Sequence, residues 1–223
     1  AENGGLNRSL FERLVEMGIE PLLLRTQYRM HPAISAFPNG HFYDDLLEDG
    51  VTSEDRPTPA GLLWPDWDMP VAFLPVTGGE VKAPDGASKE NPTEAAWIAR
   101  LLEGLLDAGE LRQKDIGIIT PYAGQVRAIR DSVPERYDGV EVRTVDGYQG
   151  REKEVILFSC VRSNSEGNVG FLADSRRLNV ALTRAKRGLI VIGDPETLRC
   201  DYDWTAWLGQ SRSRKPEAWH LPR

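Results

Sequence analysis

Residues 91–120, NPTEAAWIARLLEGLLDAGELRQKDIGIIT, set out a helix and then a buried strand. Asn91 can cap the helix that Pro92 opens, and Glu94 at the third helical position completes a start that resembles a capping box. One apolar stripe then runs to Gly109 through Ala96, Ile98, Leu101, Leu102, Leu105 and Leu106. The continuous apolar run at 116–120 predicts a strand that is covered on both faces. A helix and such a strand in succession indicate a parallel α/β domain.

The alternation of helix and strand patterns continues toward the C-terminus. After Tyr122 the sequence predicts a helix that carries Val126 and Ile129. Further predicted elements are strands at 141–145 and 155–161, a helix around 176–186 and a strand at 189–193. Two earlier apolar runs, Leu22–Leu24 and Val71–Leu74, are predicted to add strands to the same sheet. We therefore expect an α/β fold, a mostly parallel sheet with helices on both faces.

The chain is predicted to form a single domain over residues 1–223. Its hydrophobic content of 40% is ample for one core. The acidic, Pro-rich stretch at 51–70 is expected to be a loop excursion and not a second domain. The C-terminal region at 211–223, which is rich in Arg, Ser and Lys, is expected to be a loosely ordered tail.

The cysteine and histidine content argues against a zinc site or a disulfide framework. Cys160 and Cys200 have no CxxC spacing, and the three histidines are scattered. No apolar run approaches the roughly 20 residues of a membrane span, and the first residues show no signal-peptide pattern. We expect no metal ligands in this chain, no membrane partner and a cytoplasmic protein, with the nucleus as a second location.

Charge is unevenly distributed along the chain. The formal net charge is −7, far from the basic footprint of most autonomous nucleic-acid-binding domains. Residues 41–90 hold eleven Asp and Glu against three Lys and Arg, whereas residues 151–190 hold four against eight. Any phosphate chemistry is therefore expected in the later stretch.

Four segments carry recognisable motifs. They are Gln27-Tyr28-Arg29-Met30-His31-Pro32, Thr120-Pro121-Tyr122-Ala123-Gly124-Gln125, Thr144–Lys153 (TVDGYQGREK) and Arg177–Lys186 (RLNVALTRAK). Together they resemble helicase motifs IV to VI of the Up-frameshift-like branch of superfamily 1, which includes the helicases of nonsense-mediated mRNA decay. The resemblance spans roughly residues 9–195. It implies the second RecA-like domain of a P-loop NTPase, that is, the C-terminal half of an ATP-dependent RNA or DNA helicase.

Arg184 is the first candidate catalytic residue. The helix predicted around it places Arg177 and Arg184, which are seven residues apart, on a shared face. Taken alone, this pair is most simply a solvated basic stripe. The resemblance implies instead that Arg184 is an arginine finger that points at the γ-phosphate of ATP on the neighbouring domain. Such fingers are worth about 10³–10⁵ in rate in related phosphoryl-transfer enzymes.

Tyr28 and Arg29 are candidates for nucleotide binding, and Arg29 is also a candidate catalytic residue. The tyrosine ring can stack on adenine while the guanidinium fork reaches phosphate oxygens, although a tyrosine packed near a turn is an alternative. The resemblance also implies nucleotide binding by Gly150 and Glu152. A glycine lets a phosphate approach closely, and a carboxylate accepts hydroxyl hydrogen bonds. For Glu152 the alternative is a solvent-exposed carboxylate between two basic neighbours.

Six residues at or just after predicted strand ends are candidates for nucleic-acid binding. They are Thr120, Pro121, Tyr122, Thr144, Val145 and Arg162. In open α/β sheets, ligands favour the carboxyl ends of strands. Hydroxyl and amide groups there can hold phosphates, and Tyr122 offers a ring for stacking. Packing at a strand end is the alternative for each residue, but the resemblance favours contact of the group with single-stranded RNA or DNA.

The sequence lacks two elements that ATP hydrolysis requires. It contains no GxxxxGK[ST] phosphate loop and no Asp-Glu pair that would hold Mg²⁺. The resemblance assigns both to a first RecA-like domain upstream of Ala1, so we expect this chain to be part of a larger protein. That domain is the expected partner and main binder of ATP with Mg²⁺. The resemblance also implies 5′ to 3′ translocation, a role in RNA surveillance and RNA-decay factors as partners.

The leading alternative is a non-catalytic module with a helicase-like fold that binds RNA or a protein. The two hypotheses differ in whether the natural upstream sequence contains a phosphate loop. An enzyme that acts on a small molecule ranks last, because we find neither a nucleophile–base pair nor a cofactor loop.

Without the phosphate loop and the magnesium carboxylates, the isolated chain is expected to show no ATP turnover above background. The measurement is phosphate release by the purified 223-residue chain with and without single-stranded RNA. Robust hydrolysis that RNA stimulates would contradict this prediction.

Overall fold

One six-stranded parallel sheet organises the chain. The computed structural model describes residues 8–213. In the sheet order β10-β3-β9-β8-β6-β7, the strands are Arg212–Ser213, Val71–Pro75, Ala185–Gly193, Lys153–Ser159, Ile116–Thr120 and Glu141–Thr144. Every neighbouring pair is parallel. The parallel sheet follows from apolar strands that alternate with helices along the chain.

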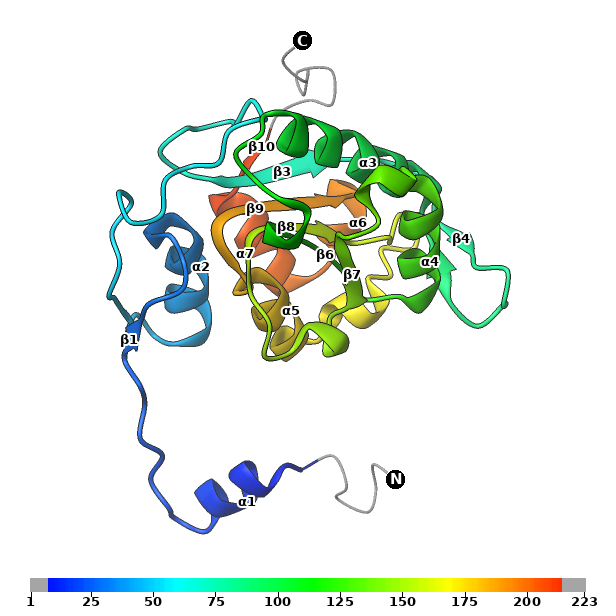
Figure 1. Ribbon diagram of the computed structural model, residues 1–223. Coiled ribbons are helices and arrows are strands. Elements are labelled where there is room, and N and C mark those ends of the chain that lie inside the picture. Colours follow the sequence, from blue (N-terminus) through cyan, green and yellow to red (C-terminus); the bar gives the residue numbers. More distant parts are fainter. Residues whose placement is uncertain (1–7, 214–223) are drawn as a thin grey trace.

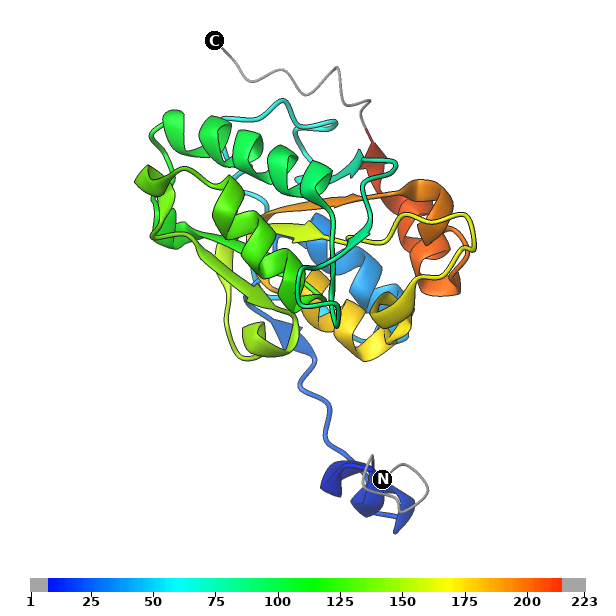
Figure 2. The same ribbon diagram turned by 90° about the vertical axis from the view of Figure 1, so that its right-hand side faces the viewer.

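Helices cover both faces of this sheet (Figures 1 and 2). On one face, α3 (Pro92–Asp107) and α4 (Ala123–Ser132) pack over a cluster that includes Ala72 and Leu74 of β3. On the other face lie α2 (Pro32–Phe42), α5 (Ser175–Leu182) and α7 (Tyr202–Gln210), over the cluster of Val71 and Phe73. Successive strand residues thus serve opposite cores. The predicted α/β fold is confirmed, and it is the RecA-like arrangement that the motifs imply.

Short elements connect these layers. The helical ones are α1 (Leu10–Glu16), α6 (Pro195–Leu198) and the 3₁₀ turns η2 (Gln113–Asp115), η3 (Glu135–Tyr137), η4 (Asp146–Tyr148) and η5 (Gly170–Ala173). The strands β1 (Thr26–Gln27) and β2 (Glu48–Asp49) pair in parallel, and β4 (Val81–Lys82) and β5 (Lys89–Glu90) form an antiparallel hairpin. Residues 51–70 contain no helix or strand, although Leu62 and Trp64 are buried. No helix among residues 8–213 is long and apolar enough to span a membrane.

The predicted helix around 176–186 is too long. α5 ends at Leu182, with Thr183 as its C-cap, and β9 begins at Ala185. The helix cannot continue through Ala185, because Ala185 belongs to the sheet and pairs with Lys153 of β8. Arg184 therefore lies in the turn between helix and strand, and the helix face that it was predicted to share with Arg177 does not exist.

The predicted strand at Leu22–Leu24 is also wrong. This segment is coil, and the exposed fractions of its side chains are 96%, 44% and 88%. It belongs to an arm, residues 8–25, that includes α1 and contains no buried residue. Both views show the arm lying apart from the sheet (Figures 1 and 2). A short apolar run indicates that a segment needs burial, but does not indicate the surface that buries it.

At the other end, part of the predicted loose tail forms a strand. Arg212 and Ser213 pair with Ala72 and Phe73 and so extend the sheet. The remaining part of the predicted tail, 214–223, lies outside the described residues, as do residues 1–7. The expectation of a single domain over residues 1–223 stays a prediction.

The predicted cap of α3 is half right. Asn91 Oδ1 accepts a hydrogen bond from the Glu94 backbone N–H at 3.1 Å. The Glu94 carboxylate does not return to the Asn91 N–H, which donates instead to Gln125 Oε1 at 2.7 Å. The carboxylate is fully buried and accepts from the Ser159 hydroxyl at 2.6 Å and from the Val161 N–H at 2.9 and 3.0 Å. It therefore joins α3 to the end of β8.

Burial raises the pKa of Glu94 to about 8, despite the hydrogen bonds from Ser159 and Val161 that act to lower it. A carboxyl group whose pKa is raised in the folded state adds stability below its unfolded pKa and loses it as the pH rises through the folded value. We expect the unfolding midpoint to fall by several degrees between about pH 5 and about pH 8, where Glu94 is ionised in the unfolded state but not in the folded state. A change of about 1 kcal/mol shifts the midpoint by roughly 2–4 °C in a chain of this size.

The measurement is thermal unfolding followed by circular dichroism. Glu94→Gln should flatten this decline, because the amide cannot ionise. Glu103→Gln changes an exposed carboxylate of the same helix and should leave the decline intact. An unchanged pH profile in Glu94→Gln would contradict the assignment.

Candidate functional site

The QYRMHP motif, residues 27–32, is hydrogen-bonded to the start of β9. The His31 N–H donates to the Lys186 carbonyl at 2.7 Å, and the buried His31 ring caps α2 by accepting from the Ala33 N–H at 3.0 Å. Gln27 Oε1 accepts from the N–H groups of Arg29 and Met30. These bonds fix the backbone of the turn that carries Tyr28 and Arg29.

Glu152 is the carboxylate around which basic side chains gather. Arg29 Nε donates to Glu152 Oε2 at 2.6 Å, and Lys186 Nζ lies 3.1 Å from Oε1. The hydrogen bond from Arg29, followed by that from Lys186, lowers the pKa of Glu152 although partial burial acts to raise it. Arg29 also donates to the Thr183 carbonyl at 3.1 Å. The structure thus brings Arg29 and Glu152, which are far apart in sequence, into one ion pair.

Arg184 stands next to this pair. Its guanidinium donates to the Val180 carbonyl at 2.9 Å, to Thr183 Oγ1 at 2.8 Å and to the Arg151 carbonyl at 3.4 Å. Burial, and then the charge of Arg29, lowers the pKa of Arg184. We call Arg29, Arg184, Lys186 and Glu152 the arginine cluster. Its three cations face Glu152, and Glu154 reaches Lys186 at 3.5 Å, so positive charge remains in excess.

Tyr28 lies at the rim of the arginine cluster, with an exposed fraction of 67%. Its ring rests on Gly50, where a Cβ would come within 2.4 Å of a ring carbon, so a larger residue would displace the ring. Arg56 donates to the carbonyls of Tyr28 and Arg29, both at 2.9 Å. The sequence analysis missed Arg56, although it is the only arginine in the acidic stretch at 51–70.

Gly150, the glycine predicted to take part in nucleotide binding, adopts a φ of +78°, a backbone conformation that favours glycine.

The predicted nucleic-acid residues meet at the carboxyl ends of β6, β7 and β8, but several are not free to bind. Thr120, Tyr122, Val145 and Arg162 are 6% exposed or less. Thr144 is half-buried, and its hydroxyl accepts from the Gly147 N–H at 3.3 Å. The side chains of Thr120 and Val145 are buried, so nucleic-acid binding by these two residues stays a prediction that requires contact through their backbone. Pro121 and Thr144 remain partly accessible there.

Arg162 is engaged by a carboxylate. Its Nε donates to Glu80 Oε2 at 3.1 Å, and its Nη1 donates to Asn168 Oδ1 at 3.2 Å and to the Tyr122 hydroxyl at 3.4 Å. Burial acts to raise the pKa of Glu80, but hydrogen bonds from Lys89, Ser163, Asn164 and Arg162 lower it to about 2. A phosphate at this place would have to compete with Glu80 for Arg162.

Two hollows open along these strand ends. The larger, of about 720 Å³, is lined by Glu80, Lys89, Tyr122, Arg162 and Phe171 among others. The smaller, of about 260 Å³, is lined by Val145, Asp146, Asp174, Arg176 and Arg177 among others. In the smaller hollow Arg177 pairs with Asp146 at 3.1 Å and Arg176 with Asp174 at 3.3 Å.

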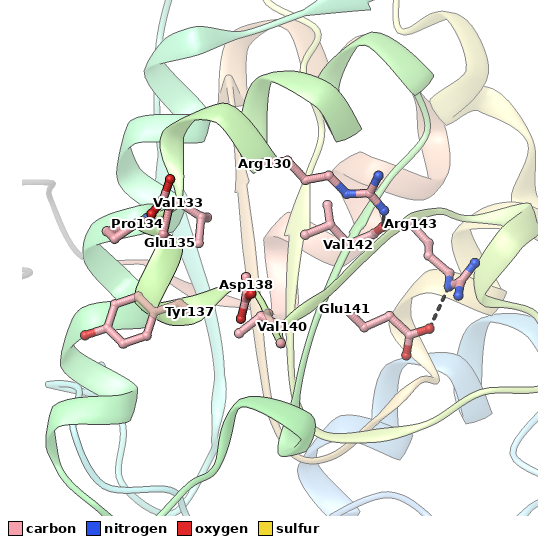
Figure 3. Close-up of a pocket in the computed structure, with 11 residues that line it drawn as sticks. Arg130, Val133, Pro134, Glu135, Tyr137, Asp138, Val140, Glu141, Val142 and Arg143 are labelled. Carbon is pink, nitrogen blue, oxygen red and sulfur yellow. Dashed lines mark hydrogen bonds and ion pairs between the residues drawn. The ribbon is translucent and has the colours of Figure 1, made fainter.

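A further hollow of about 490 Å³ lies along β7 at the edge of the sheet (Figure 3). Val133, Val140 and Val142 form its apolar part, and the rim carries Arg143, which pairs with Glu141. Arg130 reaches the Val142 carbonyl at 3.1 Å and so occupies an acceptor on the edge strand. None of the residues that the motifs single out lines this hollow, and we do not include it in the site.

Among residues 8–213, no group of three or more His, Cys, Asp or Glu side chains is arranged to hold a metal ion. The chemical resources of the site are therefore the cations of the arginine cluster, the exposed ring of Tyr28 and the polar groups of the two hollows. Such groups suit a polyanionic ligand that carries an aromatic base.

The chain matches one protein family and several named proteins. The family described as AAA domain matches residues 6–196. The Regulator of nonsense transcripts 1 homolog of Drosophila melanogaster is 45% identical over 222 residues, which cover 96% of this chain and 19% of that protein. The ATP-dependent helicase NAM7 of Saccharomyces cerevisiae is 41% identical over 222 residues, which cover 96% and 23%. The chain thus spans about a fifth of the length of these relatives.

Among solved structures, the C-terminal domain of a possible DNA helicase from Lactobacillus plantarum superposes with a TM-score of 0.45. It is 13% identical, and the match covers 80% of this chain and 96% of that one.

The arginines that line the two hollows are paired with carboxylates. This pairing predicts weak, salt-sensitive nucleic-acid binding by the chain alone. We expect a Kd for single-stranded RNA of about 10⁻⁶–10⁻⁴ M near physiological salt, as for non-specific binding, and steep weakening as salt rises. The measurement is fluorescence anisotropy of a labelled oligonucleotide over a salt series. Nanomolar binding at physiological salt would contradict the prediction.

Proposed function

Because the chain belongs to the AAA domain family, and its resemblance to Up-frameshift-like helicases is confirmed by the identities of its relatives, we propose that it is the second RecA-like half of an ATP-dependent helicase. The observation that carries this proposal is the arginine cluster. Arg29 and Lys186 pair with Glu152, and the half-buried guanidinium of Arg184 lies close enough to interact with its charge. Among the described residues, the guanidinium of Arg184 donates only to carbonyl and hydroxyl oxygens and pairs with no carboxylate. An anion that arrived from a facing domain would relieve this excess charge.

Within the proposed site, each residue has a distinct task. Arg184 is the arginine finger, which offsets the negative charge that develops on the transferred phosphoryl group. Arg29 holds phosphate oxygens, and Tyr28 stacks on the base. Glu152 orients Arg29 and Lys186 through the ion pairs described above, and Gly150 lets the backbone after η4 lie near the nucleotide.

ATP with Mg²⁺ is the proposed cofactor pair. When bound, Mg²⁺ would supply positive charge that offsets the charge of the phosphates. Its ligands are assigned to a first RecA-like domain, which also supplies the phosphate loop that this sequence lacks. The exposed apolar side chains of the arm, among them Leu10, Phe11, Val15, Leu22 and Leu24, offer that domain a surface to pack against.

The proposed motor moves along one strand of RNA or DNA, held at the carboxyl ends of β6, β7 and β8. ATP-dependent closure of the two domains would shift the strand stepwise, in the 5′ to 3′ direction. The names of the relatives point to transcript surveillance, so we propose RNA-decay factors as partners and the cytoplasm, with the nucleus as a second location, as the site of action. The alternative remains a module that binds RNA or protein without hydrolysis.

The decisive test is Arg184→Ala in the complete protein that carries both RecA-like domains. We expect kcat for ATP hydrolysis to fall on the order of 10³-fold, because the variant loses transition-state stabilisation. Single-strand affinity measured without nucleotide should be unchanged. Arg184→Lys should recover little activity, since lysine lacks the planar fork.

Arg199→Ala is the matched control, because Arg199 is an exposed arginine whose one ion-pair partner within residues 8–213 is Glu196 in α6. It should hydrolyse ATP at the parental rate. A folded Arg184→Ala protein with normal turnover would remove the finger assignment. A parallel fall in turnover, strand affinity and melting temperature would show a role in packing alone.

A further inference from the structure

The aromatic ring exposed at the strand ends belongs to Phe171 and not to Tyr122. Tyr122 is 6% exposed, whereas Phe171 is 56% exposed. The two rings lie 5.4 Å apart at an interplanar angle of 51°. The Tyr122 hydroxyl accepts from the Phe171 N–H and from Arg162, both at 3.4 Å. Tyr122 therefore supports the turn that presents Phe171.

This turn is held from several sides. Trp204 Nε1 donates to the Leu172 carbonyl at 3.0 Å, and Leu172 is itself buried. Gly170 adopts a φ of +57°, and a Cβ there would lie 2.2 Å from Arg162 Nη1 and 2.5 Å from the Tyr122 hydroxyl. Only glycine allows this approach without displacing both groups. The hydrogen bonds from Trp204 and to Tyr122, together with the close approach at Gly170, thus hold the turn that keeps the Phe171 ring at the surface.

Phe171 also stands between the two hollows. Its side chain lines the larger one with Tyr122 and Arg162. On its other side Arg177, which lines the smaller hollow, places its guanidinium 5.6 Å from the ring centroid. A single strand that runs along the carboxyl ends of β8, β6 and β7 would therefore cross this ring.

We propose that Phe171 is the platform on which an unpaired base of a single-stranded nucleic acid stacks, with Arg177 beside it to meet the adjoining phosphate. The inference rests on the proposed function and adds the contact that holds the strand. The arginines along this path are paired with Glu80 and Asp146, so phosphate contact requires exchange of partners. Stacking on the Phe171 ring breaks no ion pair of the ring itself and accepts any base, although the base shares the ring with the Arg177 guanidinium that lies over it.

The test compares Phe171→Ala with the parent in the complete protein, without nucleotide, at low salt. The probes are a labelled uridine oligomer, a thymidine oligomer and an abasic oligomer of equal phosphate number. We expect the variant to bind both base-containing oligomers on the order of 10-fold more weakly, as for loss of one stacked base. Affinity for the abasic oligomer should be unchanged. Phe171→Trp should retain binding, whereas Phe171→Leu should not.

Trp67→Ala is the matched control, because Trp67 has the same exposed fraction, 56%, and lies in the loop at 51–70. It should bind all three oligomers like the parent. Equal affinity of Phe171→Ala and the parent for the base-containing oligomers would overturn the inference and leave the proposed function standing. An equal loss on all three oligomers would overturn it likewise. A parent protein that binds none of them would overturn both.

Discussion

The buried carboxylate of Glu94 holds together the part of the fold on which the strand site depends. Val161 follows β8 at a φ of +72°, a conformation that a β-branched residue adopts only when its surroundings impose it. Both Glu94 oxygens accept from the Val161 N–H, and Asn91 Nδ2 donates to the Val161 carbonyl at 3.1 Å. The reversed backbone at Val161 turns the chain so that Arg162 points toward Glu80 and Tyr122. The cap of α3 and the strand site are thus one connected structure.

Several arginines of the two proposed sites are individually paired with carboxylates in this acidic chain. Arg162 with Glu80, Arg177 with Asp146 and Arg29 with Glu152 are examples, drawn from elements far apart in sequence. Each pair fixes a guanidinium before any ligand arrives, which limits the conformational entropy lost on binding. The same pairing weakens the attraction of the isolated chain for phosphates. Affinity then depends on a second surface that displaces or supplements these carboxylates.

Local patterns predicted the central part of the fold well, because apolar periodicity reports burial directly. The helix at 92–107 and the strand at 116–120 follow from such patterns. Patterns failed where tertiary partners decide the outcome. Leu22–Leu24 required a surface that lies outside this body, and the end of α5 was set by pairing of Ala185 in β9 with β8. Glu94 resembled a capping residue in sequence, but its partners Ser159 and Val161 lie more than 60 residues away.

In the candidate site, too, the sequence identified individual residues, whereas tertiary contacts decided how they are arranged. Motif order brought Arg29, Glu152 and Arg184 to attention, yet only the fold shows that they form one cluster at the turn before β9. Exposure separates side chains that a ligand could reach from those that support them. Tyr122 and Arg162 are buried, whereas Phe171, whose N–H donates to the Tyr122 hydroxyl, is exposed. On the proposed role of Phe171, the motif residue Tyr122 acts by positioning a residue that lies outside the four motif segments.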